Sequence, residues 1–176
     1  HTPHIDPQFE NNYNKAKNLG INVGAYYYST ALNTDMAKKE ANAFVSYLKG
    51  KKFELPVYLD IEDPHGQTDL PADTIKSIIR TFNGIMEDNK YFAGVYSMAS
   101  FLKGKAYCPE YTQWIADWGA NNGNVNKDYS GTEFVMFQYT SKYGGRSLDM
   151  NILYDPSIID VIKTKGFNGY NGEQEE

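Results

Sequence analysis

The stretch Leu55–Asp63, with the sequence LPVYLDIED, constrains the fold of this chain more than any other. Read with the two-residue period of a strand, it divides into an apolar face and a polar face. The apolar face is Leu55, Val57, Leu59 and Ile61, and the other face is Tyr58, Asp60 and Glu62. The apolar face suits packing under helices. The polar face holds two carboxylates, Asp60 and Glu62, about 6.5–7 Å apart at Cα.

Two carboxylates on one face of a strand are not something that folding requires. Burying a carboxylate near a like charge is costly and raises one of the two pKa values. One carboxyl of raised pKa beside an ionised one is the arrangement that cleaves glycosidic bonds. The alternative is a strand end that runs into an acidic loop, with both carboxylates solvated.

Composition narrows the class of protein. A chain of 176 residues is long enough for one domain with a substantial core. Its 15 tyrosines suit sugar rings, because tyrosine joins a flat apolar face to a hydroxyl. A net charge of −5 leaves no basic stripe for nucleic acid, and no apolar run reaches the length of a membrane span. The lone Cys108 excludes an internal disulfide, and one cysteine with three histidines disfavours a zinc site.

Helical periodicity and capping residues predict helices over residues 6–19, 33–49, 72–88 and 156–165, with a helical turn over 98–102. β-Branched and aromatic runs predict strands over residues 21–28, 55–62, 92–97, 111–118, 134–141 and 146–153. Residues 1–166 are the predicted catalytic domain. Residues 167–176 show no apolar period and are predicted to be a tail or linker.

The alternation of strands and helices predicts an α/β fold with a parallel sheet and right-handed crossovers. No glycine-rich phosphate loop follows a strand, so a barrel is favoured over a dinucleotide-binding sheet. Function collects at the carboxyl ends of barrel strands. Those ends carry Tyr28, Asp60, Glu62, Tyr96, Trp118, Gln138, Tyr139 and Asp149. Three acids among polar aromatics are typical of a sugar cleft, although inward-pointing aromatics also fill barrel interiors.

Seven motifs occur in series between residues 6 and about 155. They are Asp6-x-x-Phe9, Gly24-Ala-Tyr-Tyr27, Pro56-x-x-x-Asp60-x-Glu62, Gly94-x-Tyr-Ser97, Trp114-Ile-Ala116, Gln138-Tyr-x-Ser141 and Leu148-Asp-x-Asn151. In this order the chain resembles the lysozymes of glycoside hydrolase family 25, the muramidase type of phage endolysins and bacterial autolysins.

The resemblance implies an irregular, TIM-like (β/α) barrel that cleaves the β-1,4 bond between N-acetylmuramic acid and N-acetylglucosamine in peptidoglycan. Glu62 matches the family's general acid. Asp60 matches the carboxylate that stabilises developing positive charge or orients the substrate's N-acetyl group, and Asp149 matches a third acid. The remaining strand-end residues would bind substrate: Tyr28, Tyr96, Trp118, Gln138 and Tyr139. The resemblance implies no metal or cofactor.

One feature of the family is not found. The family begins with an Asp-Val-Ser strand whose aspartate is a further active-site acid, and nothing in His1–Phe9 matches it. The chain is therefore expected to lack the N-terminal strands of the family, and its exposed barrel edges are expected to favour self-association. A non-catalytic peptidoglycan-binding remnant is the alternative function. A chitinase-like barrel is a further one, although its longer Asp-rich strand motif is absent.

The expected place of action is the bacterial cell wall. The N-terminus has no apolar core of a signal peptide. The chain is therefore expected to be a phage endolysin released through a holin, or an exported protein whose N-terminus is missing.

Overall fold

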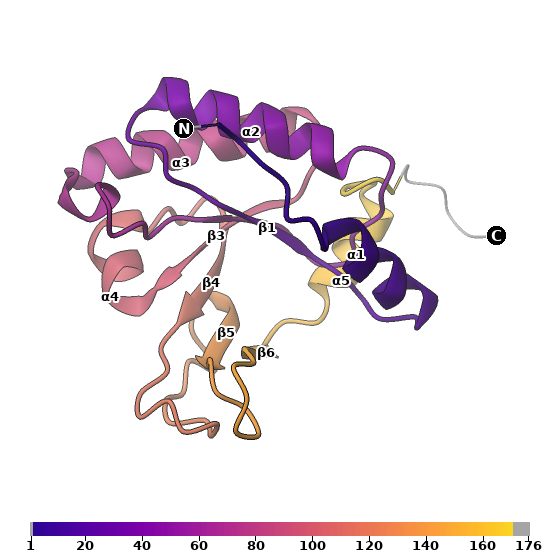
Figure 1. Ribbon diagram of the computed structural model, residues 1–176, viewed down its shortest axis with the longest axis vertical. Coiled ribbons are helices and arrows are strands. Elements are labelled where there is room, and N and C mark those ends of the chain that lie inside the picture. Colours follow the sequence, from indigo (N-terminus) through magenta and orange to yellow (C-terminus); the bar gives the residue numbers. More distant parts are fainter. Residues whose placement is uncertain (1, 171–176) are drawn as a thin grey trace.

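The computed structural model describes residues 2–170, whose strands form a single six-stranded sheet in sequence order (Figure 1). The strands are β1 (Ala25–Tyr28), β2 (Val57–Asp60), β3 (Ala93–Met98), β4 (Thr112–Ala116), β5 (Phe134–Thr140) and β6 (Met150–Leu153). The first five are parallel, and β6 is antiparallel to β5.

Most of the connections between the parallel strands contain helices. The helices are α1 (Phe9–Asn18), α2 (Thr34–Leu48), α3 (Ala72–Asp88), α4 (Ala99–Phe101) and α5 (Ile158–Thr164), with a 3₁₀ turn η1 (Gln67–Asp69) and a π-helical turn η2 (Leu102–Ala106). The long helices α2 and α3 lie side by side across one face of the sheet (Figure 1). None of the helices in the described part of the chain is both long and apolar enough to cross a membrane.

The two faces predicted for β2 are confirmed within the strand, but the prediction is wrong for Leu55, which lies two residues before the strand and packs against the cluster on the opposite face. Val57, Leu59 and Ile61 are at most 1 % exposed and belong to the core beneath the helices. Tyr58 is equally buried but belongs to a second, smaller cluster on the other face of the sheet, together with Tyr96, Ala116 and Met136. The sheet therefore lies between two packed layers at β2. Because side chains alternate along a strand, Asp60 lies on the same face as Tyr58, away from the helices.

The sheet curls into a half-barrel whose two edges, among the described residues, are β1 and β6 (Figure 1). The expectation of an all-parallel sheet is wrong for the last strand. A parallel connection needs a crossover of a dozen or more residues, whereas only residues 141–149 separate β5 from β6. The chain therefore returns beside β5 in the opposite direction.

Helix starts follow local hydrogen bonding. Asn33 caps α2 as predicted, because its side chain accepts from the Met36 N–H at 3.0 Å. Helix α1 begins at Phe9, three residues later than predicted. The Asp6 carboxylate instead accepts from the Gln8 N–H at 2.7 Å, which forms a local turn ahead of the helix.

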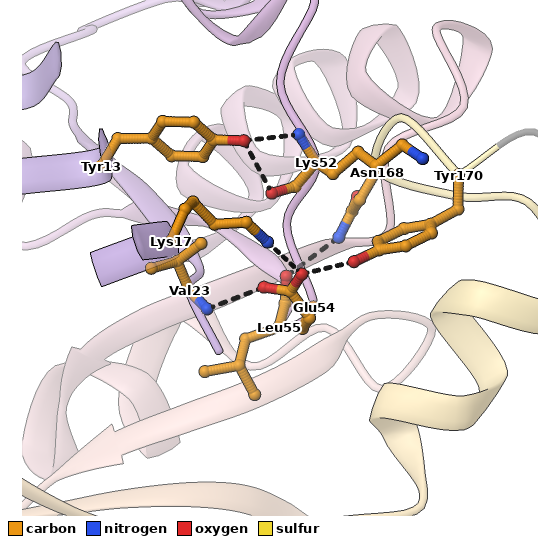
Figure 2. A network of polar contacts seen from close by, with 8 residues as sticks. All are labelled: Tyr13, Lys17, Val23, Lys52, Glu54, Leu55, Asn168 and Tyr170. Atoms are coloured by element: carbon orange, nitrogen blue, oxygen red, sulfur yellow. Dashed lines mark hydrogen bonds and ion pairs between the residues drawn. The ribbon is translucent and has the colours of Figure 1, made fainter. Parts of the chain in front are cut away.

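The segment predicted as a tail is packed over residues 167–170, whereas residues 171–176 lie outside the described part. Asn168 is fully buried and adopts a left-handed backbone conformation with φ 53°. Its side chain accepts from the Phe92 N–H at 2.7 Å and donates to the Leu55 carbonyl at 2.9 Å. Figure 2 shows the bond to Leu55. Through its two bonds Asn168 joins the segments that lead into β2 and β3, which a lack of apolar periodicity did not reveal.

Glu54 anchors the same end of the sheet (Figure 2). This carboxylate is 4 % exposed, contacts the Lys17 ammonium and accepts from the Tyr170 hydroxyl. Its other oxygen accepts from the Val23 N–H at 3.0 Å. These contacts tie α1, the approach to β1 and the C-terminal segment together at the end of the sheet opposite the acidic residues.

Candidate active site

Asp60 and Glu62 lie at the carboxyl end of β2, on the concave face of the curled sheet. Asp60 is the last residue of the ladder and pairs in register with Tyr28 on one side and Tyr96 on the other. It is 7 % exposed, and its Oδ1 is buried with no hydrogen-bond partner among the described residues. An unpaired buried carboxylate oxygen is costly in its ionised form.

Glu62 lies two residues beyond the ladder and is half-buried. Its Oε2 accepts from the Met98 N–H at 2.6 Å, and the Ser97 hydroxyl lies 3.5 Å from the same oxygen. Ser97 donates its proton to the Ile61 carbonyl at 2.8 Å. The end of β3 therefore holds both the backbone and the side chain of the acidic segment.

Electrostatics distinguish the two carboxyls. Burial, and then the charge of Glu62, raise the pKa of Asp60 to about 8. Burial also raises the pKa of Glu62, while the hydrogen bond from the Met98 N–H and the nearby Ser97 hydroxyl oppose that shift. The sequence led us to expect the proton on Glu62 and an ionised Asp60. Asp60 is the more buried of the two, so burial favours the neutral form of Asp60 more strongly than that of Glu62, and the two carboxyls titrate as a pair.

Asp149 comes immediately before β6 and is exposed. Its charge, together with that of Asp60, contributes to the raised pKa of Tyr26 and of Tyr96, for which burial is the main cause. The curl of the sheet therefore brings the third predicted acid to the same concave face as the other two.

Tyr28 and Tyr96 also lie on this face. Tyr28 is 46 % exposed, and its hydroxyl donates to Asp63 Oδ1 at 3.0 Å. Burial and this hydrogen bond raise the pKa of Tyr28 to about 12, so its hydroxyl stays protonated as a donor. Tyr96 is buried, and its hydroxyl donates to Gln138 Oε1 at 3.0 Å.

Gln138 joins two of the aromatic residues. Its Oε1 also accepts from the Trp118 indole N–H at 2.8 Å. Because both donors use the same oxygen, they fix the orientation of the amide and hold the rings of Trp118 and Tyr96 near each other. Three of the predicted binding residues therefore form one hydrogen-bonded unit.

Tyr139 is not brought to the concave face. It follows Gln138 along β5, and successive side chains of a strand point to opposite faces. Its ring lies 6.4 Å from that of Phe137 and packs against the core beneath the helices. Its place at a strand end could not reveal on which face it lies.

Two residues of the concave face were not predicted. Tyr26 is 61 % exposed and lies two positions before Tyr28, on the same face of β1. Trp114 contacts Tyr96 with ring centroids 4.6 Å apart, and its indole N–H donates to Asn151 Oδ1 at 2.9 Å. The two-residue period of a strand, counted back from Tyr28 and from Ala116, could have identified both residues.

Comparisons with known proteins agree with this geometry. The sequence profile described as glycosyl hydrolases family 25 matches residues 2–147. The chain belongs to glycosyl hydrolases family 25. It is 26 % identical over 133 residues to an autolytic lysozyme of Clostridium acetobutylicum, and the match covers 74 % of this family 25 chain but only 39 % of that relative.

Solved structures share the fold. The glycosyl hydrolase 25 GHIP of Streptococcus pneumoniae superposes with a TM-score of 0.74 at 18 % identity, over 93 % of this chain and 72 % of its own. The catalytic domain of endolysin ply40, from bacteriophage P40 of Listeria monocytogenes, gives 0.73 at 21 % identity, over 94 % and 81 %. The CTP1L endolysin gives 0.69 at 26 % identity, over 89 % and 56 %.

Proposed function

We propose that this family 25 chain is a muramidase that cleaves the β-1,4 bond between N-acetylmuramic acid and N-acetylglucosamine in peptidoglycan. The observation that carries the proposal is the Asp60–Glu62 pair, two carboxyls of raised pKa on an aromatic concave face. The names of an autolytic lysozyme and of an endolysin, each 26 % identical, support the same substrate. Because the chain spans 39 % of the curated relative's length, the activity of the whole protein is inferred.

In this proposal Glu62 is the general acid that protonates the leaving glycosidic oxygen. The Met98 N–H, 2.6 Å from its carboxylate, stabilises the charge that forms when the proton has left. Asp60 meets the oxocarbenium-like centre directly, or steers the substrate's acetamido oxygen to it. Positive charge that develops beside Asp60 favours its ionised form, so substrate shifts the shared proton toward Glu62.

The glycan is proposed to lie along the concave face. Tyr28, Tyr96, Trp118, Gln138 and Asp149 are retained as substrate-binding residues, and Tyr26 and Trp114 are added to them. Tyr139 is not retained, because its ring packs beneath the sheet. Aromatic faces beside a few oriented polar groups suit pyranose rings with their hydroxyl and acetamido substituents.

Digestion of purified cell walls tests this function. A muramidase lowers the turbidity of the suspension and releases glycans whose new reducing ends are N-acetylmuramic acid, which borohydride reduction identifies. New N-acetylglucosamine ends would refute the assigned bond. Co-sedimentation with the walls without loss of turbidity would indicate the non-catalytic binder instead.

We also infer a domain that extends at least to Tyr170, because Asn168 is buried within it. The curled sheet is inferred to belong to the irregular barrel that the resemblance implies. The protein is inferred to act on the bacterial cell wall.

Strand β1 pairs only with β2 among the described residues, and a hollow of about 920 Å³ lies beside it. Self-association through this edge is proposed. A sedimentation coefficient that does not change with protein concentration would contradict it.

A further inference from the structure

The proposed general acid lies where the sheet no longer holds the backbone. The register between β2 and β3 ends at the pair Asp60 and Tyr96. The Ile61 N–H still donates to the Tyr96 carbonyl at 3.1 Å. From Glu62 onward the backbone leaves the ladder, so other groups must determine the direction in which this side chain points.

Gln67 supplies such a group. It lies in η1 and is fully buried, and its Oε1 accepts from the Asp63 N–H at 2.9 Å. That N–H belongs to the peptide group that directly follows Glu62. Two contacts therefore hold the acid: Met98 at its side chain and Gln67 at the peptide group that follows it.

The other end of the amide is fixed as firmly. Gln67 Nε2 donates to the Ser29 and Ala31 carbonyls, each at 3.1 Å. These two residues belong to the loop that leaves β1, and the Ser29 hydroxyl in turn donates to buried Glu40 at 2.6 Å. One carboxamide therefore spans the loops that follow β1 and β2, and it is oriented because its oxygen and nitrogen have different partners.

We propose that Gln67 is the positioning residue of the general acid, and that it fixes the peptide after Glu62 so that the carboxyl stays aligned with the Met98 N–H. This inference rests on the proposed function for its catalytic meaning. It needs no contact between Gln67 and substrate, because a displacement of about 1 Å in a catalytic group can reduce the rate about 10²-fold.

Gln113 offers a matched control. It is also a buried glutamine, at 2 % exposure, and its Nε2 also donates to two backbone carbonyls, those of Cys108 and Tyr111. Its bonds lie at the start of β4, away from the acidic segment. Its Oε1 has no hydrogen-bond partner among the described residues, so Gln113→Met removes two contacts to backbone carbonyls, as Gln67→Met does, but none with the acidic segment.

The experiment compares Gln67→Met with Gln113→Met on soluble glycan fragments and by NMR. For Gln67→Met we expect kcat to fall at least about tenfold with KM within about twofold, because binding groups stay in place. We also expect the pH titration of the Met98 amide signal, which follows Glu62 across their hydrogen bond, to lose amplitude. Gln113→Met should change neither quantity, whatever its effect on Tm.

Gln67→Glu keeps an acceptor for the Asp63 N–H, while only its protonated form can donate to one of the Ser29 and Ala31 carbonyls. It serves if Gln67→Met does not fold. Its kcat should exceed that of Gln67→Met wherever both fold, and its Met98 titration should keep the wild-type amplitude. A wild-type kcat and Met98 titration in Gln67→Met would overturn the proposal, and so would an equal kcat loss in Gln113→Met. If the wild-type chain lyses no walls, the proposed function fails, and the Met98 signal still decides whether Gln67 positions Glu62.

Discussion

The Met98 N–H donates to the Glu62 carboxylate across 2.6 Å, and the two residues are 36 positions apart in the chain. The contact joins the loop after β2 to the end of β3. It stabilises the ionised carboxylate, whereas burial favours the protonated form. Glu62 is therefore held in an environment where either protonation state is accessible, as a group that gives up and regains a proton requires.

Replacement of Glu62 by Gln should abolish wall lysis and leave wall binding nearly unchanged. The amide keeps the shape of the side chain but cannot donate the proton. General acid catalysis contributes about 10²–10⁴-fold, so residual activity should fall below about 1 %. Turbidity assays measure lysis, and co-sedimentation measures binding. Retention of more than about a tenth of the activity would remove Glu62 from this role, and the exposed Glu87→Gln serves as control.

The rate of lysis should depend on pH with a bell-shaped profile. The pair must retain one proton for the leaving group, so activity falls as pH rises through the raised pKa values of Asp60 and Glu62. It falls again in acid, where both carboxyls are protonated. Initial rates on soluble fragments measure the profile. A constant rate between about pH 4 and 8 would contradict the assignment.

Asp60→Asn should increase stability toward alkaline pH. The folded chain holds the Asp60 proton up to about pH 8, whereas the unfolded chain releases it near the ordinary pKa of 3.8. The stabilisation that the protonated carboxyl contributes is therefore complete below pH 3.8 and is lost as pH rises toward 8.

Asparagine stays neutral and avoids this loss. The Tm of the variant relative to the wild-type protein should therefore rise between these limits, by about 2–4 °C for each kcal/mol. Thermal unfolding at several pH values measures the difference. The exposed Asp69→Asn should show no such trend, and a constant difference for Asp60→Asn would refute the raised pKa.

Gly94→Ala should destabilise the sheet by about 1–3 kcal/mol. A Cβ at Gly94 would lie 2.4 Å from a ring carbon of Tyr58 and 2.6 Å from the Thr112 methyl group. Tyr58 is buried and packs edge-on against Trp114, so its ring has little room to move. Urea unfolding measures the change in the free energy of unfolding.

Gly84→Ala is the matched control, because Gly84 lies in α3 with no atom within 4 Å of the added methyl group. It should stabilise the protein by up to about 1 kcal/mol. Equal effects of the two substitutions would contradict the close packing of β3 against Tyr58.

Asn168→Gly should destabilise the protein although it keeps the left-handed backbone. The substitution leaves the Phe92 N–H and the Leu55 carbonyl without their side-chain partner, which costs about 1–3 kcal/mol for each buried group. Asn89→Gly removes an exposed asparagine side chain that only bonds within its own helix end. Urea unfolding measures the loss in the free energy of unfolding for both variants. A similar loss in both would indicate that residues 167–170 are a tail that contributes little to stability.

The sequence by itself determined the elements and the faces. The alternation in Leu55–Asp63 predicted which side chains of β2 meet the helices, because the side chains of a strand alternate whatever its surroundings. Helix α3 was predicted with its observed limits, Ala72–Asp88, since its apolar period is long and uninterrupted. The order of the motifs predicted the family, which the profile match confirms.

Only the tertiary structure decided how these parts act on one another. The curl of the sheet brings Asp149 to the face of Asp60, and burial raises the pKa of Asp60. The side chains of Gln67 and Asn168 gain their roles from partners 36 and 113 positions away, Ala31 and Leu55. Local sequence encodes periodicity and capping, whereas burial and long-range hydrogen bonds depend on which segments meet, and that is decided only when the whole chain packs.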